Sequence, residues 1–213
     1  MKKLPLSFYA REDVTQVARE LLGRVLVTAV DGRITAGRIV ETEAYKAFTD
    51  RASHAFGGRR TARNEDMYGP GGIAYVYLCY GMHHMMNVVT HKRNIPEAVL
   101  IRALEPLEGI KWMLARSGKK IVDHTLTKGP GNLTKAMGID RQHSGIKLNG
   151  RQMYILEDTC PSDKEIGNSR RIGVDYAGKD ALLPYRFFIR GNAHVSGPSA
   201  LNKQIKISDR EYR

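Results

Sequence analysis

Residues 25–45 read VLVTAVDGRITAGRIVETEAY, and this stretch decides the fold of the chain. Two runs rich in β-forming residues, 25–30 and 33–45, flank Asp31-Gly32, the dipeptide that best accommodates a tight hairpin turn. The segment therefore predicts two antiparallel strands that begin an antiparallel sheet. Near the end of the second run Glu43 and Tyr45 stand two residues apart, so their side chains should point to the same face.

The sequence on either side of this hairpin continues the pattern. Apolar residues from Val14 to Leu22 follow helical spacing, Asp13 can cap the start of the helix and Gly23 suits its end. The stretch IAYVYLCYGMHHMMNVVTH at 73–91 contains two further β-rich runs, which predict a second hairpin. The tip of this hairpin would carry Tyr80, Gly81, Met82 and His83.

The second half of the chain mixes strands and helices. We expect a buried strand over 98–106, a helix over 107–118 closed by Gly118, and a short helix over 132–139 after the GPG at 129–131. Asn149-Gly150 marks another hairpin, and a last strand at 185–192 precedes a polar tail that we expect to be frayed.

Charge and composition narrow the class of protein. Lys and Arg number 34 against 22 Asp and Glu, a formal net charge of +12, which makes nucleic acid the leading partner although a merely basic soluble protein remains an alternative. The sequence contains no run of eighteen apolar residues, and this absence excludes an ordinary membrane span. The amino-terminal stretch also lacks the apolar core of a secretory signal. We therefore expect an intracellular protein with reduced cysteines, Cys79 in the core and Cys160 in a polar stretch.

Aromatic and cationic side chains alternate along the sequence. Tyr75, Tyr77 and Tyr80 lie in the second hairpin, where Tyr80 could wedge between stacked bases, although tyrosines also simply fill sheet faces. Between Lys46 and Gly72 the sequence predicts a long surface loop rich in cations. The cations that could grip phosphates on the two sides of the second hairpin are Arg51, Arg59, Arg60, Arg63, Lys92, Arg93 and Arg102.

Two groups of residues are candidates for chemistry. Glu41 and Glu43 lie on one side of an otherwise apolar strand, where one carboxylate could activate water; surface carboxylates that pair with arginines are the equal alternative. His83, His84 and His91 resemble a fragment of a metal site, but strand neighbours point oppositely and no carboxylate or cysteine completes the ligand set. We therefore expect no metal and no cofactor, and His54 alone indicates only a polar loop residue.

Several motifs together resemble the alkyladenine (3-methyladenine) DNA glycosylase family: VETEAY, SHAFGGRRTARN, YVYLCYGMHHMMN and VLIRALEPLEG, in this order and at the family's spacing. The resemblance runs from about residue 6 to residue 195, and the GPG segment and RIGVDYAG extend it through the second half. It implies an α+β single domain, here residues 1–213, with a mixed, mostly antiparallel sheet, surrounding helices and a protruding hairpin that enters the DNA minor groove.

The resemblance also implies roles for individual residues. Glu43 would be the general base that activates water, and Arg102 would help to hold that water or the nearby backbone. Tyr80 would fill the gap that the flipped base leaves in the stack. Asn87 would exclude guanine, which it would recognise by the exocyclic amino group of that base. The flipped base would lie between Tyr45, His54 and Tyr77, with the backbone amide of His54 reading its edge and Ile172 belonging to the remaining pocket wall. At the tip, His83 and His84 depart from the family pattern, which leaves DNA contacts at these positions open.

These expectations combine into one hypothesis. The protein would be a bacterial, cytoplasmic and monomeric enzyme whose partner is double-stranded DNA that contains damaged purines, and it would leave an abasic site without cutting the strand, because no lysine occupies the matched pocket positions. Alkylated adenine, hypoxanthine and ethenoadenine are all candidate lesions. One rival is a non-catalytic module that binds distorted DNA or single strands, and another is a metal-dependent nuclease that uses the histidines.

Overall fold

The computed structural model describes residues 1–198. The first part of the predicted frayed tail, 193–198, is therefore described, and it packs against the fold, because Val195 and Ser196 are buried and Ser196 bonds to Glu41. The rest of the predicted tail lies outside the described residues. Eight strands form a single sheet in the order β3-β4-β5-β2-β1-β6, with β8 on the other half of β2 and β7 beside β8. Every strand pair among the described residues is antiparallel. The strands are β1 (Val25–Val30), β2 (Arg33–Tyr45), β3 (Ala74–Cys79), β4 (His83–Thr90), β5 (Glu97–Glu108), β6 (Met153–Leu156), β7 (Ile166–Ser169) and β8 (Arg186–Ile189).

The long strand β2 occupies the centre of the sheet. Along one edge it pairs with β5, whereas along the other edge its first half pairs with β1 and residues 41–43 pair with β8. The pairing with β5 shifts register three times, between Ala36 and Gly37, between Ile39 and Glu41, and between Glu41 and Thr42. The last of these shifts leaves Arg102 of β5 without an opposite residue. Register shifts of this kind are β-bulges, which redirect side chains. The last two bulges lie in the part of β2 that carries Glu41 and Glu43.

The two faces of the sheet have different surroundings, because side chains alternate along each strand. On one face, residues such as Val76, Val88 and Ile101 join the main hydrophobic core. On the other face, their sequence neighbours Tyr75, Asn87 and Leu100 line a cavity. The strands that stabilise the core therefore also position the cavity.

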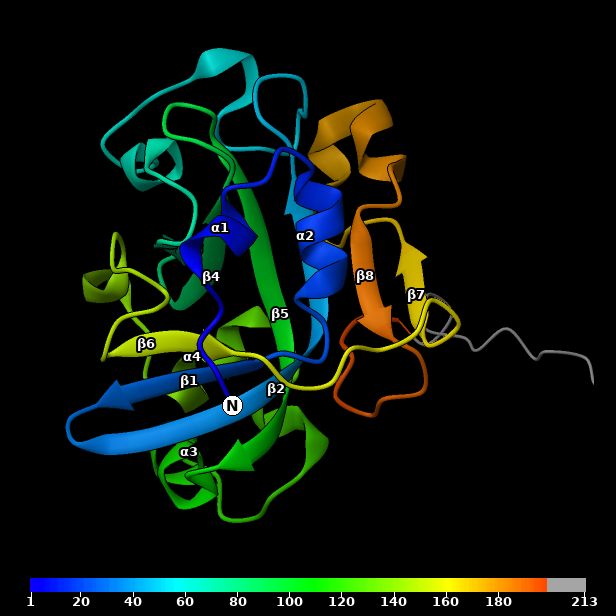
Figure 1. Cartoon of the computed structure of the whole chain (residues 1–213). Helices are drawn as coiled ribbons and strands as arrows, with labels where there is room; N and C mark the ends of the chain where they lie inside the picture. Colours follow the sequence, from blue (N-terminus) through cyan, green and yellow to red (C-terminus); the bar gives the residue numbers. More distant parts are fainter. Residues whose placement is uncertain (199–213) are drawn as a thin grey trace, which may run out of the picture.

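Helices cover the core face (Figure 1). The first is α1 (Leu6–Tyr9); α2 (Val14–Glu20) packs against β2, β5 and β8, and Asp13 caps it by accepting hydrogen bonds from two backbone amides. Helix α3 (Ile110–Ser117) ends at Gly118 as predicted, and α4 (Pro130–Met137) packs on α3, β4 and β5. The prediction for α4 was two residues late, because Pro130 starts the helix: its fixed φ and missing N–H suit the first helical position.

The remaining segments correct three predictions. The stretch between Lys46 and Gly72 is not simply a surface loop, because it forms the short 3₁₀ helices η1 (Phe56–Gly58) and η2 (Glu65–Tyr68) and buries hydrophobic side chains such as Ala55, Met67 and Tyr68. At Asn149 the expected hairpin is reduced to one bridge, with Tyr154. Cys79 lines the cavity instead of the core.

Short 3₁₀ helices also follow the core helices in the chain, namely η3 (His124–Leu126), η4 (Arg141–His143) and η5 (Asp175–Leu182). In Figure 1, η5, drawn in orange, lies at the same end of the molecule as the cyan 46–68 segment. Across residues 1–198, no helix combines the length and apolar character that a membrane crossing requires. The α+β class and the predicted hairpins at 25–45 and 73–91 are confirmed.

Candidate active site

A cavity of about 480 Å³ opens on the face of the sheet opposite the core. Strands β2, β3, β4 and β5 form its floor, and the 46–68 segment and the 172–176 segment form its walls. Of the residues predicted to form a site, the lining includes Tyr45, His54, Arg63, Tyr77, Tyr80, Asn87, Arg102 and Ile172. The structure thus gathers residues that are up to 127 positions apart in the sequence, the separation between Tyr45 and Ile172.

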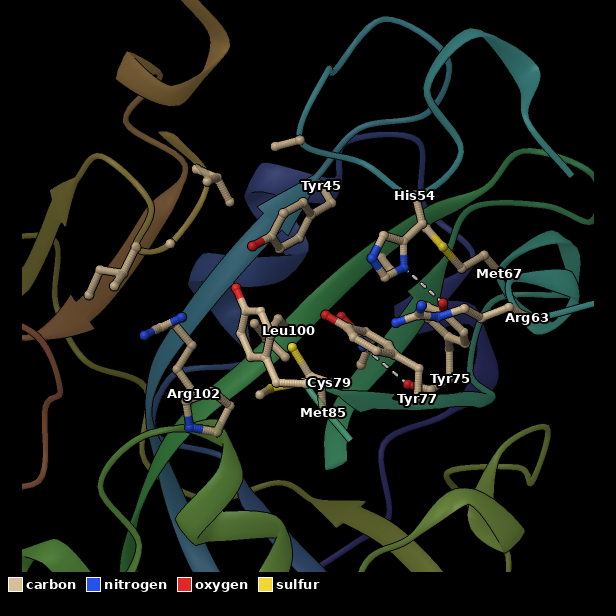
Figure 2. A pocket seen from close by; sticks show the side chains of 18 of the residues that line it. Tyr45, His54, Arg63, Met67, Tyr75, Tyr77, Cys79, Met85, Leu100 and Arg102 are labelled. Carbon is tan, nitrogen blue, oxygen red and sulfur yellow. Dashed lines mark hydrogen bonds between the residues drawn. The ribbon is translucent and has the colours of Figure 1, made fainter. Parts of the chain in front are cut away.

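Aromatic rings dominate the walls of this cavity. Figure 2 shows Tyr45 on one side and His54, Tyr75 and Tyr77 on the other. The ring centroids of His54 and Tyr77 lie 4.6 Å apart with an interplanar angle of 66°, and those of Tyr75 and Tyr77 lie 5.3 Å apart. These three rings contact one another, so a flat, electron-poor group could enter between their cluster and Tyr45, since aromatic faces attract positive charge.

His54 is held in its neutral form. Its Nδ1 lies 2.9 Å from the hydroxyl of Tyr75, and burial, followed by the charges of Arg63 and Arg59, lowers the pKa of His54 to about 4. The imidazole therefore carries no charge at neutral pH. Burial also raises the pKa of Tyr75 and of Tyr77 above the usual value, so both phenols stay protonated.

Glu41 and Glu43 are both fully buried, so neither is the surface carboxylate of the alternative interpretation. Oε2 of Glu43 accepts hydrogen bonds from the Tyr45 hydroxyl at 2.8 Å and from Nη1 of Arg102 at 3.2 Å, and Oε1 accepts from the backbone N–H of Ile172 at 2.8 Å. Glu43 itself is absent from the cavity lining, but all three of its donors belong to lining residues. Its carboxylate lies directly behind the wall.

Glu41 has a different set of partners. It accepts from Nε of Arg102 at 2.8 Å and Nε of Arg186 at 2.7 Å, and also from the backbone N–H and the hydroxyl of Ser196 at 2.7 and 2.9 Å. Burial opposes ionisation of Glu41, but the charges of Arg102 and Arg186 outweigh it and lower the pKa of this carboxyl. Glu41 therefore serves as a fixed anion that orients Arg102.

Arg102 lies at the β-bulge between β2 and β5, where it has no paired residue on β2. This position lets its side chain contact the carboxylates of both Glu41 and Glu43. Its side chain is buried and contacts Glu41 through Nε and Glu43 through Nη1. Burial acts against its charge, but Glu43 and Glu41 outweigh this and raise the pKa of Arg102. The sequence alone gave no sign of this bulge.

A buried ion pair braces the wall that carries Ile172, and sequence reasoning missed it. Arg171 donates to the two carboxylate oxygens of Asp50 at 2.5 and 2.8 Å, and to the backbone carbonyl of Ala44 at 2.9 Å. Its guanidinium also lies 4.7 Å from the ring centroid of Tyr45. These contacts fix the residue that precedes Ile172, and thereby the N–H that binds Glu43.

The cations predicted to contact a DNA backbone do not all lie together. Arg63 lines the cavity, and both Arg59 and Arg63 line a second, adjoining cavity. Arg60 lines neither of these cavities; it forms an ion pair with Glu65 and lies 4.5 Å from the ring centroid of Tyr68. Lys92 and Arg93 follow β4 at the end opposite the Tyr80 tip.

The hairpin tip is strongly exposed. Tyr80 is 86% and Met82 72% exposed, and Tyr80 adopts a left-handed backbone with φ of 50°. Below the tip, the Thr134 hydroxyl of α4 donates to the carbonyl of His84 at 2.9 Å, which braces the hairpin. The three histidines of the suggested metal set do not lie together. His83 and His84 start β4, whereas His91 follows its last residue, so roughly 25 Å of strand separates His83 from His91.

Comparisons with known proteins show the family to which the chain belongs. A family model described as methylpurine-DNA glycosylase (MPG) matches residues 7–193. A protein from Clostridium acetobutylicum, provisionally named a 3-methyladenine DNA glycosylase, is 47% identical over 91% of this chain and 97% of its own length. Proteins with the same provisional name from Bacillus cytotoxicus and Desulfitobacterium hafniense are 46% and 43% identical, over 91% and 92% of this chain and 99% of their own lengths. The chain therefore belongs to the methylpurine-DNA glycosylase family and is a DNA glycosylase.

Proposed function

We propose that this glycosylase flips alkylated or deaminated purines out of double-stranded DNA and hydrolyses their N-glycosidic bond with a water that Glu43 activates. The flipped base would lie between Tyr45 and the rings of His54 and Tyr77, and Tyr80 would fill the gap in the base stack. The substrates would be the class of 3-methyladenine, 7-methylguanine, hypoxanthine and ethenoadenine.

The observation that carries this proposal is the difference between the two buried glutamates. A carboxylate offers about four acceptor positions. Glu41 uses at least four, whereas Glu43 accepts three hydrogen bonds among residues 1–198. One position on Glu43 therefore remains for a water, and its partners keep the acceptor at a fixed orientation toward the cavity wall.

The chemistry of the cavity supports selection of damaged purines. Alkylation of a ring nitrogen leaves a purine cationic, and a cation is attracted by the faces of Tyr45 and Tyr77. A neutral His54 adds a further ring without adding a repelling charge. The weakened glycosidic bond of such a base needs little help from a general acid, so water activation by Glu43 is the main requirement.

The same cavity favours hydrolysis without strand cleavage. A lyase step needs an amine that forms a Schiff base with the sugar, and the lining contains no lysine within the described part of the chain. We therefore propose that the product is an abasic site in an intact strand. Borohydride trapping of a covalent complex on abasic DNA would contradict this part of the proposal.

Single-turnover release of the base from a duplex with one hypoxanthine or one 3-methyladenine tests the proposal. Wild type and Glu43→Gln are compared in EDTA, and binding of the same duplex is measured for both. Release by wild type together with binding but no release by Glu43→Gln is the expected result. Binding without release by either protein would indicate a damage-binding module, and loss of release on adding EDTA would indicate the metal-dependent rival.

A further inference from the structure

The 195–197 segment, near the end of the described chain, returns to the buried charges of the site. Its first residue, Val195, is 3% exposed and packs in a small hydrophobic cluster with Val40 of β2 and Ala103 of β5. Both strand residues are sequence neighbours of the buried charged groups described above. The apolar contacts therefore anchor the segment beside these groups.

The hydroxyl of Ser196 completes a three-point attachment of the Arg102 guanidinium. Nε of Arg102 donates to Glu41 at 2.8 Å, and Nη1 donates to Glu43 at 3.2 Å. Nη2 donates to Oγ of Ser196 at 3.3 Å, and Ser196 is itself held on Glu41 through its hydroxyl at 2.9 Å and its backbone N–H at 2.7 Å. Because a guanidinium is planar and rigid, holding Nε and Nη2 fixes the direction in which Nη1 points, which is toward Glu43.

Gly197 brings the same segment against a second partner of Glu43. Gly197 has a left-handed backbone with φ of 82°, and a Cβ added at this position would clash with Cδ1 of Ile172. The backbone N–H of Ile172 donates to Oε1 of Glu43 at 2.8 Å. The 195–197 segment therefore contacts Arg102 and Ile172, two of the three residues within 1–198 that donate to Glu43.

We propose that Ser196 and Gly197 are positioning residues for base excision, which hold Arg102 and Ile172 so that these two keep the Glu43 carboxylate in its reactive orientation. The inference rests on the proposed role of Glu43 as the general base. Small displacements of a reacting group can slow an enzyme strongly, so such support should be visible in the rate. Neither Ser196 nor Gly197 lines the cavity, so binding of damaged DNA should not depend on them.

Removal of the Ser196 hydroxyl tests the first part of this proposal. Ser196→Ala keeps the backbone bonds of the segment but takes away the acceptor for Nη2 of Arg102. We expect single-turnover release of hypoxanthine from a duplex to slow about 10-fold, the effect of losing one hydrogen bond to a charged group, and binding to change less than about 2-fold.

Ser169→Ala is the matched control. The Ser169 hydroxyl also accepts from a buried guanidinium, Nη1 of Arg186 at 2.9 Å, but none of its hydrogen bonds among residues 1–198 involves Arg102 or a glutamate. This variant should therefore release the base at the wild-type rate. The proposal is overturned if both serine variants slow release equally, or if the defect of Ser196→Ala lies in binding.

A double variant shows whether the hydroxyl acts through the arginine. In Arg102→Lys the charge remains, but an ammonium cannot reproduce the planar three-point attachment. Ser196→Ala should therefore slow release by Arg102→Lys no further. Effects that multiply in the double variant, as independent sites do, would overturn the positioning role of Ser196.

The part played by Gly197 has its own test. Gly197→Ala should displace Ile172 and slow release roughly 10-fold or more, and adding Ile172→Val, which removes Cδ1, should restore part of the rate relative to Ile172→Val alone. No recovery would show that backbone strain at residue 197 causes the loss, and would overturn this part. Release by Glu43→Gln at the wild-type rate would instead contradict the proposed function, and the two serine variants would still show whether the segment controls the release rate.

Discussion

The hydroxyl of Tyr45 donates a hydrogen bond to Oε2 of Glu43 at 2.8 Å. The ring proposed to stack on the damaged base is thus bonded to the carboxylate proposed to activate water. Burial, and then the charge of Glu43, raise the pKa of this phenol well above its usual value, so it remains a donor throughout the working pH range. This hydrogen bond therefore connects the proposed base-stacking ring with the proposed water-activating carboxylate.

Replacement of Tyr45 by Phe tests this connection. The ring and its stacking remain, but Glu43 loses one of its three donors, and a hydrogen bond to a charged group contributes about 1.5–3 kcal/mol. We expect binding of damaged duplex to change little and single-turnover base release to slow by roughly 10- to 100-fold. An equal loss in binding and in release would show that the hydroxyl acts on the bound base instead of on Glu43.

The hairpin tip provides a second prediction. Tyr80→Ala should slow base release from duplex DNA by roughly 10- to 100-fold, because stacking of an aromatic side chain is worth about 1–3 kcal/mol per base. Release from the same lesion in a single strand should change little, since no gap must be filled. Met82→Ala is the control at the same exposed tip; a similar loss in this variant would mean that apolar bulk, not an inserted ring, is what the hairpin supplies.

Asn87 is predicted to limit the bases that are accepted. It lies in the cavity lining, and its side-chain amide donates to the carbonyl of Tyr75 at 3.1 Å, which holds it rigidly. Asn87→Ser removes bulk at this position, so release of 7-methylguanine should rise relative to that of 3-methyladenine. The ratio of the two released bases from methylated DNA measures the effect, and an unchanged ratio would contradict a role in excluding the exocyclic amino group.

His54 should make stability depend on pH. Its folded-state pKa of about 4 lies below the ordinary value of 6.5, so the neutral form stabilises the fold fully above about pH 6.5, and this contribution is lost as the pH falls toward 4. Between pH 7 and pH 5 wild type should lose roughly 2 kcal/mol more unfolding free energy than His54→Asn. Urea unfolding at both pH values provides the measurement, and parallel losses in the two proteins would contradict the buried neutral imidazole.

The ion pair between Arg171 and Asp50 should contribute to stability through its burial. Arg171→Met leaves the carboxylate of Asp50 without its cation, which should cost about 3–5 kcal/mol of unfolding free energy. A double variant with Asp50→Asn removes the stranded charge and should recover part of that loss. If the double variant is no more stable than Arg171→Met, the arginine acts through its other contacts, those with Ala44 and the ring of Tyr45.

Local patterns predicted much of the fold. The alternation along β2 correctly placed Glu43 and Tyr45 on one face, and Asp31-Gly32 marked the turn between β1 and β2. The aromatic hairpin around Gly81 was also evident, because short-range periodicity and turn chemistry determine such elements. The motif resemblance then pointed to seven of the nineteen residues that line the cavity, namely Tyr45, His54, Tyr77, Tyr80, Asn87, Arg102 and Ile172.

Other parts of the site depend on contacts that no local pattern encodes. Arg171 and Asp50 lie 121 positions apart and reveal their pairing only in the folded chain. The register shift that turns Arg102 toward both glutamates is a property of two paired strands, not of either sequence alone. The buried side of the 46–68 segment was likewise hidden, because its apolar residues are scattered among polar ones without a helical or strand period.

The central position of β2 has a consequence for the order in which the protein becomes active. Glu41 and Glu43 leave the ribosome early, but their partners Ile172, Arg186 and Ser196 belong to the last part of the described chain. Synthesis proceeds from the amino terminus, so a nascent chain carries both carboxylates long before they are oriented. An unfinished or prematurely terminated product therefore lacks the groups that orient both carboxylates, and with Glu43 in its proposed role we predict that such a product does not excise bases from the genome of the cell that makes it.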